Sequence, residues 1–129
     1  MSSNQIPACG IDIHVSTHYL AQQSNPANST FAFSYTITIT NRRLDSVRLL
    51  SRHWIITDQN NHVERVEGSG VVGQQPVIHP AQSYQYTSGA VLKTATGDMR
   101  GAYAMVSSTG EKFDAPIPLF ILAAPHMVH

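Results

Sequence analysis

The chain has 129 residues, of which 42% are hydrophobic and 12% are charged, and eight Lys and Arg residues balance eight Asp and Glu residues. This length suits one domain with a sizeable core and is short for two. A formal net charge of zero excludes bulk electrostatic attraction to nucleic acid or to an anionic membrane. We therefore expect neither a nucleic-acid partner nor a membrane partner.

Cys9 is the only cysteine, which excludes an intrachain disulfide and a cysteine-based metal site. The N-terminal residues lack the charged and apolar segments of a secretory signal. The most apolar run, residues 115–125, contains prolines and is shorter than a bilayer span. These features predict a soluble, cytoplasmic protein.

Along the chain, apolar and polar residues alternate with a period of two, which is typical of half-buried strands. The alternation is clearest in residues 31–41, where Phe, Tyr and Ile alternate with Ala, Ser and Thr. Residues 47–57 carry apolar groups in both phases, which indicates a central strand. No segment predicts a long amphipathic helix. Strands are predicted at residues 11–19, 31–41, 47–57, 62–67, 82–89, 98–107 and 112–122.

The last predicted strand carries Pro116 and Pro118. A proline cannot donate to a neighbouring strand, so this strand should lie at a sheet edge with both prolines facing outward. The opposite phase, which should face inward, contains Phe113, Ile117, Leu119 and Ile121.

About seven strands with frequent turns predict an all-β fold, an immunoglobulin or fibronectin III-like two-sheet antiparallel β-sandwich. Trp54 lies in the third strand, where such folds bury a tryptophan. Tyr103 lies two residues before Met105, a spacing similar to that of the tyrosine corner. A small closed barrel is the competing architecture.

Gly68, Gly70 and Gly73 have the spacing of a dinucleotide-binding signature. That signature requires a following helix, and Pro76 excludes one here. Gln74 stands where a phosphate-binding loop would carry lysine. We expect the three glycines to serve the backbone, through positive φ angles or close approach. The alternative is a weak anion or nucleotide site formed by backbone N–H groups.

The seven histidines predict no metal site. His14 and His18 lie four residues apart, which on a strand separates them by about 13 Å, so they cannot share an ion. His126 and His129 could meet near the C-terminus, whereas His53, His62 and His79 could converge only through the fold. The carboxylates are dispersed rather than clustered as magnesium requires.

No pattern in the chain predicts catalysis. A G-x-S-x-G elbow is absent, and no close pair of carboxylates suggests acid and base roles. Cys9 with His14, or His79 with Ser83, could form a nucleophile and a base, but neither pair has an evident third group to orient it. We expect a protein that is not an enzyme and uses no cofactor.

Several longer runs closely resemble the bacterial ApaG family. They are "EGSGVVGQQPVIHPAQSYQYTSG" at 67–89, "RHWIITD" at 52–58, "DMRGAYAM" at 98–105 and the Pro-x-Phe-x-Leu pattern at 118–122. The resemblance extends from about residue 5 to His129, and it implies a single ApaG domain over residues 5–129.

The resemblance implies a fibronectin III-like sandwich with no established enzymatic activity. It also implies genetic links to cobalt and magnesium tolerance and to a neighbouring diadenosine tetraphosphate hydrolase. A similar domain occurs in eukaryotic F-box proteins and in a DNA-polymerase-delta-interacting protein, where it serves as a binding module. We accordingly expect a protein-interaction module with a protein partner that the sequence does not identify.

The first and last strands are the natural sheet edges at which a partner strand could add, and edge pairing could equally produce a homodimer. Thr36, Thr38 and Thr40 should form a flat polar face suited to protein contact. Tyr84 and Tyr86 share one phase of their strand; we expect them in the core, with an exposed interface as the alternative.

Overall fold

The structure, a computed structural model, describes residues 7–125 and is built almost wholly of strands. No helix in this part of the chain has the length and apolar character needed to span a bilayer. The elements are β1 (Ile11–Tyr19), the short 3₁₀ helices η2 (Ala21–Gln23) and η3 (Pro26–Asn28), β2 (Phe31–Asn41), β3 (Val47–Asp58), β4 (Val63–Ser69), β5 (Val77–Ile78), β6 (Ser83–Leu92), β7 (Thr96–Ser107) and β8 (Lys112–Ala123).

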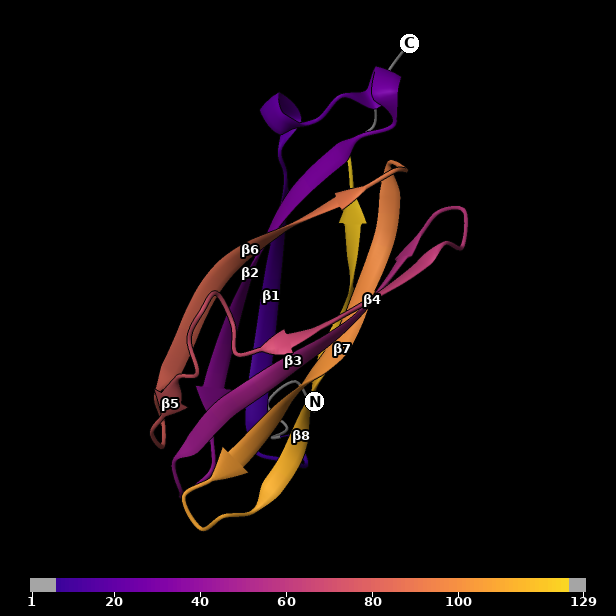
Figure 1. Ribbon diagram of the computed structural model, residues 1–129. Helices are drawn as coiled ribbons and strands as arrows, with labels where there is room; N and C mark the ends of the chain where they lie inside the picture. Colours follow the sequence, from indigo (N-terminus) through magenta and orange to yellow (C-terminus); the bar gives the residue numbers. More distant parts are fainter. Residues whose placement is uncertain (1–6, 126–129) are drawn as a thin grey trace, which may run out of the picture.

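The strands form two sheets that face each other (Figure 1). One sheet has the order β1-β2-β6, and the other has the order β4-β3-β7-β8, with β5 paired to the beginning of β3. All pairings are antiparallel. The predicted two-sheet antiparallel β-sandwich is therefore confirmed, and the competing closed barrel is wrong.

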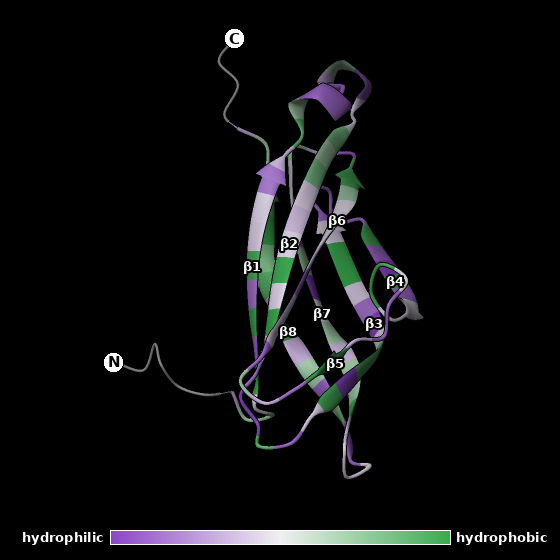
Figure 2. Cartoon of the chain, turned by 90° about the vertical axis from the view of Figure 1, so that its left-hand side faces the viewer, coloured by the Kyte–Doolittle hydropathy of each residue, from purple (hydrophilic) through white to green (hydrophobic). Residues whose placement is uncertain are grey.

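The alternation of β2 explains why its residues form a strand that is buried on one face. Phe33, Tyr35, Ile37 and Ile39 are all buried, whereas the intervening residues 34, 36, 38 and 40 are partly exposed. Figure 2 shows this alternation as bands of green and paler colours along β2. The buried side chains meet those of the second sheet in one hydrophobic core.

β3 lies inside its sheet, as its sequence predicts. It pairs with β7 along one side and with β5 and then β4 along the other. Trp54 is buried and makes edge-to-face contacts with Tyr35 of the opposite sheet and with Phe120 of β8, at centroid distances of 5.6 and 5.8 Å. The tryptophan thus packs both sheets together, because such contacts add to its apolar burial.

β8 is an edge strand with both prolines exposed, but only half of its predicted inward face is correct. The register with β7 shifts, because Met99 pairs with Phe120 while Gly101 pairs with Ile117. This bulge reverses the side-chain phase. Leu119 and Ile121 are consequently 54% and 56% exposed, so their predicted burial is wrong; Phe120 and Leu122 face the core instead.

Tyr103 does not form the predicted tyrosine corner. Its side chain is fully buried, and its hydroxyl shares a hydrogen bond with the hydroxyl of Tyr86 on the opposite sheet. A tyrosine corner would instead bond a backbone group. Burial raises the pKa of both phenols, so the pair remains neutral and joins the two sheets through a single hydrogen bond.

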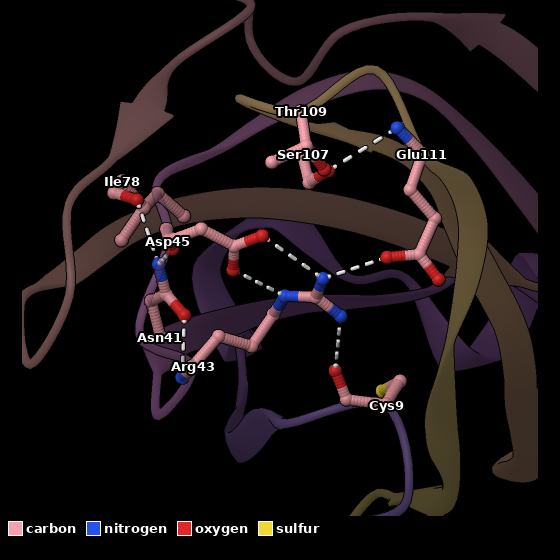
Figure 3. A network of polar contacts seen from close by, with 8 residues as sticks. All are labelled: Cys9, Asn41, Arg43, Asp45, Ile78, Ser107, Thr109 and Glu111. Atoms are coloured by element: carbon pink, nitrogen blue, oxygen red, sulfur yellow. Dashed lines mark hydrogen bonds and ion pairs between the residues drawn. The ribbon is translucent and has the colours of Figure 1, made fainter.

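Asn41, at the end of β2, has no solvent-exposed surface. Its side-chain nitrogen donates to the carbonyl oxygens of Asp45 and Ile78 at 2.8 and 2.9 Å, and its side-chain oxygen accepts from the Arg43 N–H at 2.8 Å (Figure 3). A buried amide with its bonds satisfied is tolerated in a core. Asn41 therefore fixes the turn after β2 and the position of β5.

Arg43 extends the same network (Figure 3). Its guanidinium donates to both carboxylate oxygens of Asp45, to Glu111 and to the Cys9 carbonyl oxygen, and it lies 4.5 Å from the centre of the Phe113 ring. Hydrogen bonding to Arg43 lowers the pKa of the Asp45 carboxyl. The network joins both sheets at the end of the sandwich where β2, β7 and β8 meet the connecting turns.

We expect Asn41→Ala to lower the free energy of unfolding by about 2–3 kcal/mol, because it leaves buried donor and acceptor groups without partners. The matched control is Asn60→Ala, in an exposed turn. Urea unfolding monitored by Trp54 fluorescence measures both variants. Equal stability of the two variants would contradict the role assigned to Asn41.

Candidate functional site

A groove opens along one side of the sandwich. At the other side β1 and β8 contact each other across the two sheets. We call the open side the β6 groove: residues 86–93 form one wall, residues 62–73 form the other, and the floor consists of Tyr35, Arg52, Trp54, Ile56 and Met99. Two adjoining hollows of about 330 Å³ each share Tyr35, Arg52, Trp54 and Ser88, and a smaller hollow lies next to Lys93.

The groove is open because residues 70–78, which follow β4, form hydrogen bonds with β3. The Gly70 N–H donates to the Leu50 carbonyl at 2.8 Å, and the Leu49 N–H donates to the Pro76 carbonyl at 3.0 Å. β5 then pairs with β3 rather than with β6. Within residues 7–125, the backbone of β6 consequently bonds only to β2, and its other edge is free.

The free edge of β6 lacks the features that usually block strand addition, namely charges, prolines and bulges. β8 has two prolines and a bulge. β4 carries three charged residues among seven, and β1 carries Asp12 and lies against β8. In contrast, β6 has ten residues without a charge or a proline, and it pairs with β2 without a register shift.

The walls of the groove leave part of the core uncovered. Ile56, Val66 and Ala90 pack against the core but are only half-buried. Tyr86 is buried and Tyr84 is half-buried against the core, so the predicted core placement of these two tyrosines is confirmed. An apolar side chain placed in the groove would complete the burial of this strip, which is favourable.

Arg52 is the cation on the groove floor. Its side chain is half-buried, and Nη1 donates to the carbonyl oxygens of Ser69 and Gly70 at 3.1 and 3.0 Å. No acidic side chain within residues 7–125 forms an ion pair with it. Burial raises the pKa of the nearby Tyr35 phenol, and the charge of Arg52 lowers that pKa by a smaller amount.

Gly68 provides the space in which the Arg52 guanidinium lies. A Cβ atom at position 68 would be 2.7 Å from Cζ, Nη1 and Nη2 of Arg52. A side chain at this position would displace the guanidinium, so Gly68 permits the observed position of Arg52, and Gly68 does not have a positive φ angle. The sequence did not reveal that Arg52 lies beside Gly68, because the two residues are brought together only by the register of β3 and β4.

Gly70 and Gly73 shape the tight loop that follows β4. Gly70 has φ +62°, and a Cβ there would overlap the Gln74 carbonyl. Val71 and Gln74 exchange two backbone hydrogen bonds around Val72 and Gly73, which have φ 47° and 76°. These angles have the signs of a type I′ turn. Val72 is strained in this conformation and is 62% exposed at the groove.

Gly70 and Gly73 thus adopt the positive φ angles expected from the sequence, whereas Gly68 does not and instead lies against the Arg52 side chain. Three N–H groups of the loop, those of Gly70, Val71 and Gln74, already donate to carbonyl oxygens within the loop or of Leu50. These groups are engaged, so a ligand anion at the loop would rely on the remaining amides and on Arg52. The predicted anion site at the glycines remains a prediction.

The other candidate residues do not converge. Nδ1 of His79 shares a hydrogen bond of 2.8 Å with the Ser46 hydroxyl. The sequence had suggested Ser83 as the partner of His79. The Cys9 thiol contacts the Ile11 carbonyl. His126 and His129 lie outside the described residues. Within 7–125, no group of three or more His, Cys, Asp or Glu residues is close enough to hold a metal ion.

The outer face of the three-stranded sheet carries the predicted polar surface. Thr36 and Thr40 form hydroxyl pairs with Thr87 and Ser83 of β6, at 2.8 and 2.7 Å, and Thr38 accepts from the Gln85 side chain at 2.8 Å. These hydrogen bonds fix β6 to β2 on the side opposite the core, so the strand is held firmly while its far edge stays free.

The fold and the groove define a small two-sheet antiparallel β-sandwich in which the edge of β6 borders an open groove. A family model for the ApaG domain matches residues 21–107. The chain is 53% identical over 123 residues to Protein ApaG of Pseudomonas putida, covering 95% of this chain and 98% of that protein. It is 50% identical over 119 residues to Protein ApaG of Azoarcus sp., covering 92% and 94%. The chain belongs to the ApaG family.

Solved structures agree with this assignment. A crystal structure of a Bordetella pertussis protein described as ApaA is 43% identical, with a TM-score of 0.88 over 91% of this chain and 95% of that one. The C-terminal domain of wzt shares the fold with a TM-score of 0.54 over 92% and 75% of the two chains, at only 6% identity. The resemblance to ApaG seen in the sequence is thus confirmed.

We expect Gly70→Ala to destabilise the protein more than Gly73→Ala. Both glycines have positive φ angles, which cost an L-residue about 1–2 kcal/mol. Only at position 70 would the added methyl group also overlap the backbone, since no atom of residues 7–125, apart from the two chain neighbours, lies within 4 Å of a Cβ at position 73. Thermal unfolding of the two variants compares them directly, and a larger loss for Gly73→Ala would contradict this description of the loop.

Proposed function

We propose that this protein is a non-enzymatic protein-interaction module that binds an extended segment of a partner along the free edge of β6. The observation that carries the proposal is the contrast between β6 and the other edges: β6 alone among β1, β4, β6 and β8 combines a free edge with the absence of charge, proline and bulge. Unpaired N–H and C=O groups on such an edge accept a further strand.

The β6 groove supplies what strand addition requires beyond backbone bonds. Alternate side chains of an added strand point to one face, here toward the half-buried Ile56, Val66 and Ala90. Covering these side chains removes apolar surface from water, which stabilises the complex. The backbone of β6 thus provides affinity, and the groove provides a surface that distinguishes one segment from another.

The protein would perform the cellular role that the family resemblance implies by binding its protein partner. Links to cobalt and magnesium tolerance require no ion to bind this chain, and we propose that they are indirect. The Ser46–His79 pair does not suggest hydrolysis, because both residues are partly or fully exposed and His79 uses Nδ1 toward the serine. The single hydrogen bond of that pair instead connects the turn before β3 to the segment after β5.

The test begins with linear peptides selected on the protein from a random display library, followed by titration of the isotope-labelled protein with one synthesised peptide. We expect the largest amide shifts in residues 83–92. Ala90→Lys places a charge inside the groove and should abolish binding, because an inward charge blocks an edge. Val91→Lys, on the outward face of the same strand and 64% exposed, should bind normally.

Two results would overturn the proposal. One is a library that yields no peptide with saturable binding. The other is a peptide whose footprint lies on β1 or β8, or whose affinity is the same for wild type and Ala90→Lys. The circular dichroism spectrum and the unfolding midpoint of Ala90→Lys show whether the variant is folded. We expect it to fold, because position 90 is only half-buried.

A second candidate function is weak binding of an anion or nucleotide at Gly68, Gly70 and Gly73. The position of the Arg52 guanidinium against Gly68 favours it. Titration with pyrophosphate, ATP and diadenosine tetraphosphate distinguishes the two. Under the main proposal the amides of residues 68–75 do not shift in a saturable manner, whereas saturable shifts confined to this loop would favour the second candidate.

A further inference from the structure

We infer that the β6 groove selects a segment with an acidic side chain, whose carboxylate binds the Arg52 guanidinium. This inference rests on the proposed function and names the chemistry of the partner. It predicts a five-residue motif in the bound segment, with an acidic residue at the third position, apolar residues at the first and fifth, and any residue at the other two. The two hollows beside Arg52 explain the apolar positions, because Tyr86 and Val72 line one hollow and Val66 and Ala90 line the other.

The Arg52 guanidinium is already fixed in an orientation in which it can bind an anion. Two carbonyl oxygens accept from Nη1, and Gly68 lies against the guanidinium face. Within residues 7–125, no hydrogen bond is made by Nε or Nη2. A guanidinium that is already fixed loses little further entropy when it binds a carboxylate through two parallel hydrogen bonds. The half-buried position strengthens such a pair relative to a fully exposed one.

The charges around the groove restrict where the acid can bind. Glu64 also lines the larger hollow that contains Val66 and Ala90, but it lies four residues before Gly68 on β4, which places it about 13 Å farther along the strand. Asp58, His62 and Lys93 line the small hollow beyond it. The end of the groove near Ser88 therefore has Arg52 as its charged group, while the far end carries both signs. An acidic residue near Ser88 is favoured, and one near Glu64 is repelled.

The same chemistry disfavours a second copy of this chain as the occupant. An antiparallel pair of β6 strands would place Ser83–Leu92 of the second copy in the groove, and this strand contains no carboxylate. The guanidinium would then be covered without gaining a counter-ion, which is costly. A partner strand that carries Asp or Glu satisfies both the edge and the cation.

The experiment repeats the library selection on wild type and on three variants. Arg52→Gln removes the charge, Arg52→Glu reverses it, and Arg65→Gln is the matched control at an exposed position of β4. We expect wild type and the control to enrich Asp or Glu at one fixed position between two apolar ones. Arg52→Gln should lose this preference, and Arg52→Glu should enrich Lys or Arg there.

A synthesised peptide from the wild-type selection gives the quantitative test. Replacing its Asp or Glu by Asn or Gln should weaken binding to wild type roughly tenfold or more, as for a hydrogen-bonded charge, and should have little effect on binding to Arg52→Gln. The peptide variant needs no change in the protein, so this measurement stands even if an Arg52 variant folds poorly.

The outcomes separate the inference from the function on which it rests. Peptides that bind along residues 83–92 without an acidic preference, or with one that persists in Arg52→Gln, would overturn the inference and leave the proposed function intact. Two copies that associate through β6 at working concentration and exclude peptides would overturn both. An acidic preference that follows the charge at position 52 supports both.

Discussion

The open side of the sandwich depends on one constraint, which is that residues 70–78 are held along β3. Hydrogen bonds from Gly70 to Leu50 and from Leu49 to Pro76, followed by the pairing of β5, keep this segment in the larger sheet. Constant-type immunoglobulin domains have a fourth strand in the sheet that has three here. Because residues 70–78 do not supply such a strand, β6 has a free edge in the described part of the chain, and the core beside it remains partly uncovered.

The loop that enforces this arrangement also prepares the groove. Gly68 makes room for the Arg52 guanidinium, and the carbonyl oxygens of Ser69 and Gly70 hold it in place. The turn around the strained and exposed Val72 then borders the same hollow. Strain in a protein is often kept where function requires it, so one short stretch fixes the sheet topology, orients the cation and shapes one wall of the groove.

Most of the fold was accessible from the sequence, because burial on one face of a strand imposes a period of two that residues 31–41 display clearly. The errors have local causes. The bulge in β8 reversed the side chains of Leu119 and Ile121, and bulges leave no reliable sequence signal. The two-residue strand β5 is too short to show periodicity. The glycine cluster and a strand at residues 82–89 were recognised, but the free edge of that strand and the position of Arg52 beside Gly68 were not, because the site forms through pairing of distant segments.

Hydrogen exchange of the β6 amides in the unliganded protein tests the central claim most directly. In an antiparallel edge strand, every second amide bonds to the neighbouring strand and the others face outward. We predict that slow and fast exchange alternate along residues 83–92, whereas amides of the central strand β3 are slow throughout. Uniformly slow exchange along β6 would contradict the account, since it would mean that another strand, from this chain or from a second copy, already covers the edge.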